Sequence, residues 1–306
     1  MNTESNAVTV SPGESRAAAC ATPTFYWSVK RELWENKSIY IVPLIVAGVV
    51  LLGALISSAH LPERRRAAML LDEGHRRAAI ELHYNIVAMM IIITAFIVGL
   101  FYCLDALYGE RRERSILFWK SLPVSDLTTV LSKVSIPLLV LPPIVLGIVI
   151  VTQFLMLLIS SAVLLPSGLA STTWANFNLL QQSGIMFYSL IVIALWHAPI
   201  YGWALLISGL ARRATFLWAV MPFIAIGIFE KITFNTTYFG SMLKNRLLGA
   251  GDTAFDLQMH HSISIDSLAQ LTPGRFLATP GLWLGLIFAA AFVIGAIRLR
   301  RYRGPL

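Results

Sequence analysis

The sequence predicts an all-α, polytopic membrane protein with six transmembrane helices. Hydrophobic residues make up 57% of the 306-residue chain and charged residues only 13%, whereas about 25% of the residues of a soluble domain are charged. The apolar residues also gather in six runs, most of them close to the roughly 20 residues that a helix needs to cross a bilayer. These runs cover residues 39–58, 86–107, 136–165, 185–210, 214–232 and 280–298.

The third run is longer than one upright span requires. As a helix, residues 136–165 would be about 45 Å long, against a hydrocarbon core of about 30 Å. Pro137, Pro142 and Pro143 lie near its start, and proline inside a helix removes a hydrogen bond and favours a break. We therefore expect a cytoplasmic lead-in followed by one true span. Between the last two runs we expect short helices over Tyr238–Leu248 and Phe255–Met259.

The polar N-terminal residues differ from the rest of the chain. Residues 1–21 lack the charged start and the early apolar core of a cleaved signal peptide. We expect them to form a disordered cytoplasmic tail, followed by a single transmembrane domain over residues 22–306.

The net charge of +8 favours membrane lipids rather than nucleic acid as partners, because the basic residues lie between apolar runs, next to lipid headgroups. Most of the 24 Lys and Arg residues fall on one side if both termini are cytoplasmic, so we expect that orientation. The segment 60–84 runs against this rule, with five arginines on the outer side: Arg64, Arg65, Arg66, Arg76 and Arg77.

The segment 22–37 predicts a helix that lies on the membrane surface. Thr22 can cap it, and Pro23 suits its first turn. Its apolar arc includes Trp27, Leu33 and Trp34, while its opposite arc holds Arg31, Glu32 and Glu35. A helix of this kind buries its aromatic face among the headgroups. The alternative is that it simply extends the first span.

The segment between the second and third runs carries the strongest functional signal. Its first half is charged, with Glu110, Arg111 and Arg114, and its second half is apolar up to Pro123. We expect a short cytoplasmic helix over 110–125 that presses an apolar side into a groove on a soluble partner. That side would hold Ile116, Phe118, Trp119 and Leu122, and Ser125 or Asp126 could cap the next helix. The alternative is a generic basic loop.

The run from Glu110 to Ser125 resembles the cytoplasmic segment of ABC-2 type transporter permeases. The resemblance rests on Glu110-Arg111 and on Leu122-Pro123-Val124-Ser125 at the expected separation. The chain departs from the family pattern at Arg114-Ser115, where the family often has Gly-Thr, and at Leu117, where an acid is common. The order of spans is also similar over the whole chain.

The resemblance implies the transmembrane subunit of a bacterial ABC exporter in the inner membrane. It further implies a dimer, with a second permease copy that is identical or different, and dimer contacts through spans one and five. Two separate ATPase subunits would dock on the 110–125 coupling helix and hold the ATP and Mg, so this chain itself would bind no cofactor. The docking residues would be Glu110, Arg111, Arg114, Ile116, Phe118, Trp119, Leu122 and Pro123. Cargo in this family is lipidic, peptide or drug-like.

The sequence carries none of the motifs that would make the chain an enzyme. No lysine follows a glycine, so a P-loop for ATP is missing. No histidine precedes a glutamate, and no Gly-x-Ser-x-Gly elbow occurs. We therefore predict no catalytic residue and no metal site. Two other functional classes stay open: a non-transporting membrane anchor or sensor that uses an ATPase, and an ion-coupled secondary transporter.

Three polar residues within or beside the spans are candidates for a transport pathway: His197, Gln153 and Asp105. Ionisable groups inside a membrane are functional candidates by default. Each also has a structural alternative. His197 could bond to a neighbouring helix, Gln153 could join packed helices, and Asp105 could pair with Arg111 or Arg112. In the sixth run, Gly281 and Gly285 have the spacing of close helix packing.

Overall fold

The computed structural model describes residues 24–121, 124–256 and 268–303, and for 119–121 it describes the backbone only. Six of its helices are long and apolar enough to span a membrane, by length and composition. They are α2 (Ser38–Ser57), α4 (Glu73–Ala106), α8 (Leu141–Leu164), α10 (Leu179–Leu210), α11 (Thr215–Phe234) and α15 (Pro280–Tyr302). Each coincides with a predicted run, as expected for a multi-pass α-helical membrane protein. The described residues contain no β-strand, only an isolated bridge between Phe255 and Leu271.

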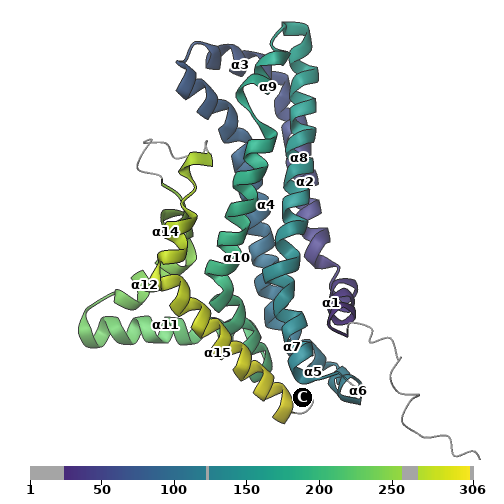
Figure 1. Cartoon of the computed structure of the whole chain (residues 1–306), viewed down its shortest axis with the longest axis vertical. Helices are drawn as coiled ribbons and strands as arrows, with labels where there is room; N and C mark the ends of the chain where they lie inside the picture. The colour runs from purple at the N-terminus through teal and green to yellow at the C-terminus, as the bar shows by residue number, and fades with distance from the viewer. Residues whose placement is uncertain (1–23, 122–123, 257–267, 304–306) are drawn as a thin grey trace, which may run out of the picture.

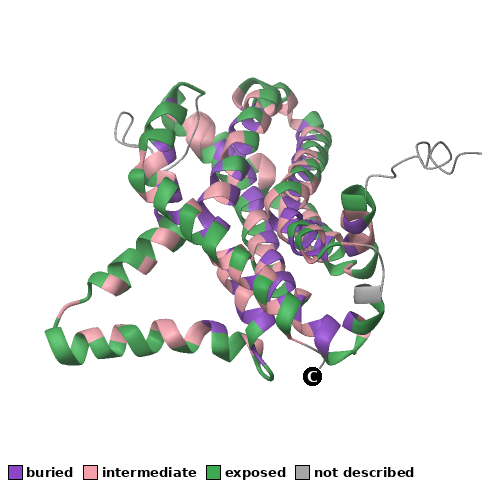
Figure 2. Cartoon of the chain, turned by 60° about the horizontal axis from the view of Figure 1, so that its bottom comes forward, coloured by how far each residue is buried: buried purple, intermediate pink, exposed green. Residues whose placement is uncertain are grey.

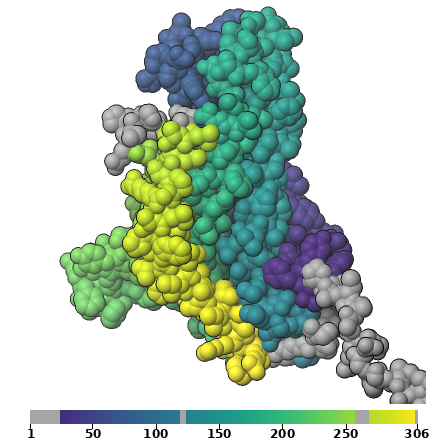
Figure 3. All heavy atoms as spheres, viewed as in Figure 1, coloured from purple at the N-terminus to yellow at the C-terminus, as the bar shows by residue number. Residues whose placement is uncertain are grey.

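Helix α10 is the centre of the bundle and packs against α4, α8 and α15, while α2 packs against α4 and α8 (Figure 1). The core between them is built from large, fully buried side chains, including Tyr84, Ile91, Met156 and Leu205. Exposed residues lie on the outward faces of the same helices (Figure 2). Helix α15 crosses the bundle diagonally, as its yellow surface in Figure 3 shows.

The two ends of the bundle hold different short elements (Figure 1). One end, here named the α5–α6 end, carries the C-terminus with α5 (Tyr108–Arg112), α6 (Ser115–Ser121) and the start of α7 (Asp126–Ser135). The opposite end carries α3 (Leu61–Met69) and α9 (Ala170–Asn176), with the 3-10 turns Ser58–His60 and Leu165–Ser167. The remaining elements are α1 (Thr24–Glu35), α12 (Tyr238–Leu248), α13 (Ala250–Ala254), α14 (Pro273–Ala278) and the 3-10 turn Leu268–Gln270.

Two helices begin earlier than the apolar runs predict. Helix α4 begins at Glu73, where the residues are too polar to count toward a span but still form a helix with an Arg77–Glu81 pair at 2.8 Å one turn apart. Helix α10 begins at Leu179 because the Asn178 side chain accepts hydrogen bonds from the backbone N–H groups of Leu180 and Gln181. The second helix that we expected in the 233–279 stretch is displaced. Helix α13 ends at Ala254, Phe255 is extended, and residues 257–259 lie outside the described part.

The expected break in the third run is wrong. Helix α7 continues into a π-helical turn over Ile136–Val140 and then into α8, so that 126–167 forms one helical stretch. A π-turn accommodates an extra residue without ending the helix, and it occurs at Pro137, where proline has no N–H to donate to the preceding turn.

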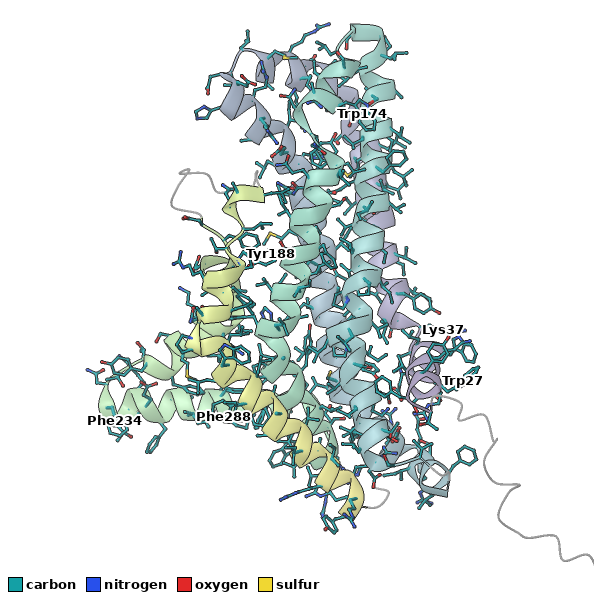
Figure 4. All side chains as sticks on the ribbon, in the orientation of Figure 1. Trp27, Lys37, Trp174, Tyr188, Phe234 and Phe288 are labelled. Atoms are coloured by element: carbon teal, nitrogen blue, oxygen red, sulfur yellow. The ribbon has the colours of Figure 1, made fainter. Side chains whose placement is uncertain are left out.

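Helix α11 lies across the bundle direction instead of alongside the other spans (Figure 1). Ala219 is its only buried residue, and Phe234 lies at the end far from the bundle (Figure 4). Helix α12, which occupies the residues that the sequence predicts, returns toward the bundle. Glu230 joins the two helices, because its carboxylate accepts hydrogen bonds from the backbone N–H groups of Tyr238 and Phe239 at 2.6 and 2.9 Å.

Candidate functional site

The segment expected to form one coupling helix forms two short helices instead. Helix α5 ends at Arg112 and α6 begins at Ser115. Between them, Arg114 has φ +59°, a left-handed conformation that costs most residues about 1–2 kcal/mol and costs glycine little. This is the position at which the resembled family often has glycine. Ser125 caps α7 as expected, with its hydroxyl accepting from Thr128 N at 3.0 Å.

Helix α5 is hydrogen-bonded to the C-terminal end of α10. The Arg111 guanidinium donates hydrogen bonds to the backbone oxygens of Gly209 at 2.8 Å and Ala211 at 3.2 Å. The Ser208 hydroxyl accepts hydrogen bonds from the backbone N–H groups of Leu107 and Tyr108 at 2.9 and 2.8 Å. These four hydrogen bonds join residues 107–111 to the end of α10.

A buried ionic cluster lies directly behind α5. The Lys133 ammonium is 2.9 Å from a carboxylate oxygen of Glu32 and 3.1 Å from one of Glu110. The side chains of Lys133, Glu32 and Glu110 are 3%, 1% and 9% exposed. Burial of this depth makes charged pairs sensitive to the loss of either partner, at about 3–5 kcal/mol.

The cluster extends to two further helices. Arg300 of α15 pairs with Glu110 through one nitrogen and with Asp126 of α7 through another, at 3.0 Å. The Tyr102 hydroxyl of α4 donates to Glu32 at 2.9 Å, and Arg31 lies 2.8 Å from Glu32 and 3.8 Å from Glu110. We name these residues the ionic cluster: Arg31, Glu32, Tyr102, Glu110, Asp126, Lys133 and Arg300. It joins α1, α4, α5, α7 and α15.

The ionic cluster contains equal numbers of opposite charges. Three carboxylates, Glu32, Glu110 and Asp126, face three cations, Arg31, Lys133 and Arg300, and the half-exposed Glu35 lies 3.6 Å from Arg31 at its edge. Burial alone would raise the pKa of Glu32, but the neighbouring Lys133 and Arg31 more than offset this, so that the pKa of Glu32 lies below its ordinary value. Glu32 is therefore ionised, and its charge is held in place by two cations.

Helix α6 carries an exposed apolar turn on the outside of this cluster. Leu117 and Phe118 are 58% and 60% exposed, whereas Ile116 is only 1% exposed. The expectation that Ile116 belongs to a docking face is therefore wrong, because it packs inward. Glu110 and Arg111 are also buried and act as internal anchors, whereas Arg114 is exposed. The side chain of Trp119, and Leu122 and Pro123, lie outside the described part.

The helix expected over residues 22–37 is present as α1 over Thr24–Glu35, but its polar arc is not what the sequence predicts. Trp27 and Trp34 are exposed, while Leu33 packs against the core, and Trp27 lies on the outside of α1 (Figure 4). Lys30 lies 4.9 and 4.8 Å from the ring centres of Trp27 and Trp34. Glu32, expected on the solvent side, faces the bundle instead because Lys133 binds it there.

The three polar candidates, Gln153, Asp105 and His197, have different surroundings in the structure. Gln153 is buried and donates to the backbone oxygen of Tyr84 at 3.4 Å, which links α8 to α4. Asp105 is exposed and has no ion pair within 4 Å among the described residues. Its expected pairing with Arg111 or Arg112 is therefore wrong, because Arg111 binds the end of α10 and Arg112 pairs with Glu113.

His197 belongs to a second buried polar site, between α10, α12 and α15. Its two ring nitrogens lie 2.8 Å from the backbone oxygen of Ile193 and 3.2 Å from that of Leu247. The adjacent Arg246 guanidinium stacks 4.7 Å from the centre of the Trp196 ring and donates to the Gly281 oxygen at 3.0 Å. A Cβ on Gly285 would lie 1.6 Å from this guanidinium. The spacing of Gly281 and Gly285 thus makes room for an arginine.

Of the ionic cluster, the sequence indicates only Glu110 as a site residue. Lys133 and Arg300 are among the basic residues between and after the apolar runs, with no further signal, and Glu32 is expected on the solvent side of its helix. The sequence does contain one signal for Glu32. Val29, three residues before it, and Leu33, the next residue, are both apolar, which indicates that Glu32 is close to the buried face of its helix. For Arg300 nothing in the local sequence indicates that it reaches back to residue 110.

No family model, no curated protein and no solved structure matches this chain. The interpretation of the site therefore rests on its own geometry and on the short motif within residues 110–125.

Proposed function

We propose that this chain is the permease subunit of an ATP-binding-cassette transporter, driven by a separate ATPase that docks on the exposed turn of α6. The observation that supports this most is the combination of Leu117 and Phe118, which face solvent, with the ionic cluster behind them. Exposed apolar side chains at the tip of a polar segment are typical of a protein–protein contact. A rigid connection to five helices is what a part that transmits motion requires.

The proposed mechanism begins when ATP, with Mg, closes a pair of ATPase subunits. Their movement shifts the α6 turn, and α5 follows because the two helices are joined at Arg114. Arg111 and Ser208 carry this displacement to α10, and Glu110 carries it to α7 and α15 through Lys133 and Arg300. The path for cargo would then open between this chain and a second permease copy, identical or different.

In this proposal the α5–α6 end and both termini are cytoplasmic, and the membrane is a bacterial inner membrane. The basic residues of the turn, Arg112 and Arg114, and of the last helix, Arg298 and Arg301, lie at that end, as the preference of Lys and Arg for the cytoplasmic side predicts. The resemblance of residues 110–125 to ABC-2 type permeases implies export of a lipidic, peptide or drug-like cargo.

The docking claim is tested with a photoactivatable phenylalanine analogue in place of Phe118, in the full chain in its native membrane. We expect crosslinking to a protein that is itself labelled by azido-ATP. The matched control carries the analogue in place of Leu70, which is 89% exposed and lies at the opposite end of the bundle. A nucleotide-labelled adduct from position 70 as strong as that from 118, or none from 118, would refute the docking site.

Two other functions give different results in the same system. A non-transporting anchor or sensor gives the nucleotide-labelled adduct but no ATP-dependent movement of cargo in reconstituted vesicles. An ion-coupled transporter gives movement that depends on a gradient, without the adduct. The transporter proposal requires the adduct and also ATP-dependent movement that Leu117→Ala/Phe118→Ala abolishes.

A further inference from the structure

An apolar groove of about 590 Å³ runs along the bundle between two long helical stretches. One wall is α7, the π-helical turn and the start of α8, and the other wall is α10. Volumes of 300–1,000 Å³ are usual for sites that hold a small molecule. The floor is formed by small side chains, Ala194 and Ala198, one turn apart on α10, and this spacing is what leaves the groove open.

The lining of the groove excludes a polar ligand. Among the described residues that line it, Ser135 is the only one whose side chain has a polar atom, and its hydroxyl already donates to the backbone oxygen of Ser132 at 2.7 Å. A charged or hydrogen-bonding group placed in the groove would therefore lose water without gaining a partner. The occupant has to be hydrocarbon along the whole length.

The groove opens on a surface that faces lipid rather than water. Residues on its rim are large, apolar and exposed, including Leu139 at 69% and Phe187 at 56%. They belong to the long apolar helices that span a membrane. Water does not fill an apolar groove readily, so the surrounding hydrocarbon has free access to it.

The groove begins at the α5–α6 end of the bundle. Its lining starts beside Leu131, two residues from Lys133 of the ionic cluster, and it includes Phe25 of helix α1. On this wall the lining continues to Leu146, about 22 Å further along at 1.5 Å per residue. An elongated, wholly apolar site of this kind fits a hydrocarbon chain that enters from the α5–α6 end.

We infer that this groove is a binding site for one acyl chain of a lipid from the leaflet at the α5–α6 end. The inference does not depend on an ATPase or on the direction of transport. The occupant is a chain of a membrane phospholipid, because phospholipid is the hydrocarbon that surrounds long apolar helices in a bilayer. This chain lies against α7, the helix that carries Lys133.

The test uses the full chain in vesicles that contain a small fraction of phospholipid with a diazirine at the middle of one acyl chain. After irradiation, peptide mass spectrometry measures labelling of the groove residues 187–198 relative to the exposed residues of α8 around Val151. We expect preferential labelling of the groove in the wild type. Equal labelling of the two regions would overturn the inference without reference to any variant.

Two variants locate the site further. Ala194→Phe fills the groove, and we expect its labelling to fall by about tenfold or more, because several methylene groups lose their burial. Val151→Phe adds an aromatic ring to an exposed position of α8 and should leave the labelling unchanged. Ala198→Phe, at the other end of the floor, serves where Ala194→Phe fails to fold. Unchanged labelling in a folded filling variant would contradict the site.

A second arm replaces the phospholipid by a diazirine fatty acid at the same concentration. Preferential labelling by the phospholipid supports a membrane lipid as the occupant. Preferential labelling by the fatty acid would overturn that assignment and identify a free acid instead. If neither probe labels the groove above the α8 surface, no acyl chain binds there.

Discussion

Two sites of the molecule hold positive charge away from water by different means. In the ionic cluster, the buried Lys133 and Arg300 face carboxylates at hydrogen-bonding distance. At the second site, the partly buried Arg246 packs against the Trp196 ring and donates to the Gly281 oxygen, with no ion pair within 4 Å among the described residues. The first site depends on charge, and the second depends on the space left by a missing side chain at Gly285.

This difference teaches what each site can tolerate. A charge network binds several helices at once and fails when one charge is removed, because its partner stays buried. A guanidinium that is held by a ring and a carbonyl oxygen tolerates changes of nearby charge but not of shape. The predictions below test this contrast from the largest expected effect to the smallest.

The largest effect is expected for Lys133→Met, which leaves Glu32 and Glu110 buried without their shared cation. We expect the free energy of unfolding in mixed micelles to fall by about 3–5 kcal/mol. Adding Glu32→Gln to Lys133→Met should recover part of this loss, because one bare charge disappears. Lys244→Met, at an exposed position, is the control and should change little. Equal effects of Lys133→Met and Lys244→Met would show that the cluster is not a charge network.

Gly285→Ala should destabilise the Arg246 site through shape alone. The added Cβ would lie 1.6 Å from the guanidinium, so Arg246 has to leave the Trp196 ring, at a cost of about 2 kcal/mol. In an Arg246→Ala background the same substitution should be almost neutral, and a double-mutant cycle measures this coupling. Gly227→Ala, where the new Cβ meets nothing within 4 Å, is the control. Additive effects in the cycle would show that Gly285 does not act by leaving space for Arg246.

Acid should weaken the ionic cluster through Glu32. The pKa of Glu32 lies below its ordinary value of 4.5 because Lys133 and Arg31 outweigh the effect of burial. Its contribution to stability is therefore complete above pH 4.5 and is lost as the pH falls through the lower, folded-state pKa. Unfolding measured across this range should show a steeper acid loss for the wild type than for Glu32→Gln. Identical slopes would mean that Glu32 contributes no such charge interaction.

The smallest effect is expected at the rim of the cluster. Asp126 is 30% exposed where it pairs with Arg300, so water screens the pair, and Asp126→Asn should cost about 1 kcal/mol or less. Glu110→Gln removes a carboxylate that is only 9% exposed, and its loss should clearly exceed that of Asp126→Asn in the same unfolding assay. The reverse order would show that burial does not set the strength of these pairs.

The sequence predicts the helices far better than it predicts the contacts between them. All six spans and the helix Tyr238–Leu248 follow from apolar length and local turn residues. The two-part shape of the 108–121 segment does not, because it depends on one left-handed residue, Arg114, whose type gives no such signal. The continuity of the helix through Pro137 also depends on a π-turn, which proline content alone does not indicate.

The candidate site shows the same limit more sharply. Glu110 and Arg111 were identified by the motif, yet their partners, Lys133, Arg300 and the end of α10, are about 20 to 190 residues away in the chain. Such pairings depend on how the helices cross, and a single amino-acid sequence does not indicate which helices cross or at what level. Ile116 was predicted on the docking face for a related reason. The prediction assumed one helix over 110–125, but the chain turns at Arg114, and the separate seven-residue helix α6 directs Ile116 toward the core.

The isolation of α11 has a consequence for how the protein is made. It is the least apolar of the six long apolar helices, and Ala219 is its only buried residue. Neighbouring helices therefore contribute little to hold it in the bilayer as it leaves the ribosome and the translocon, and its own side chains have to drive its insertion. A single lysine near the middle of α11, worth about 2.5–3.5 kcal/mol against insertion, would impair biosynthesis more than the same residue in any other span.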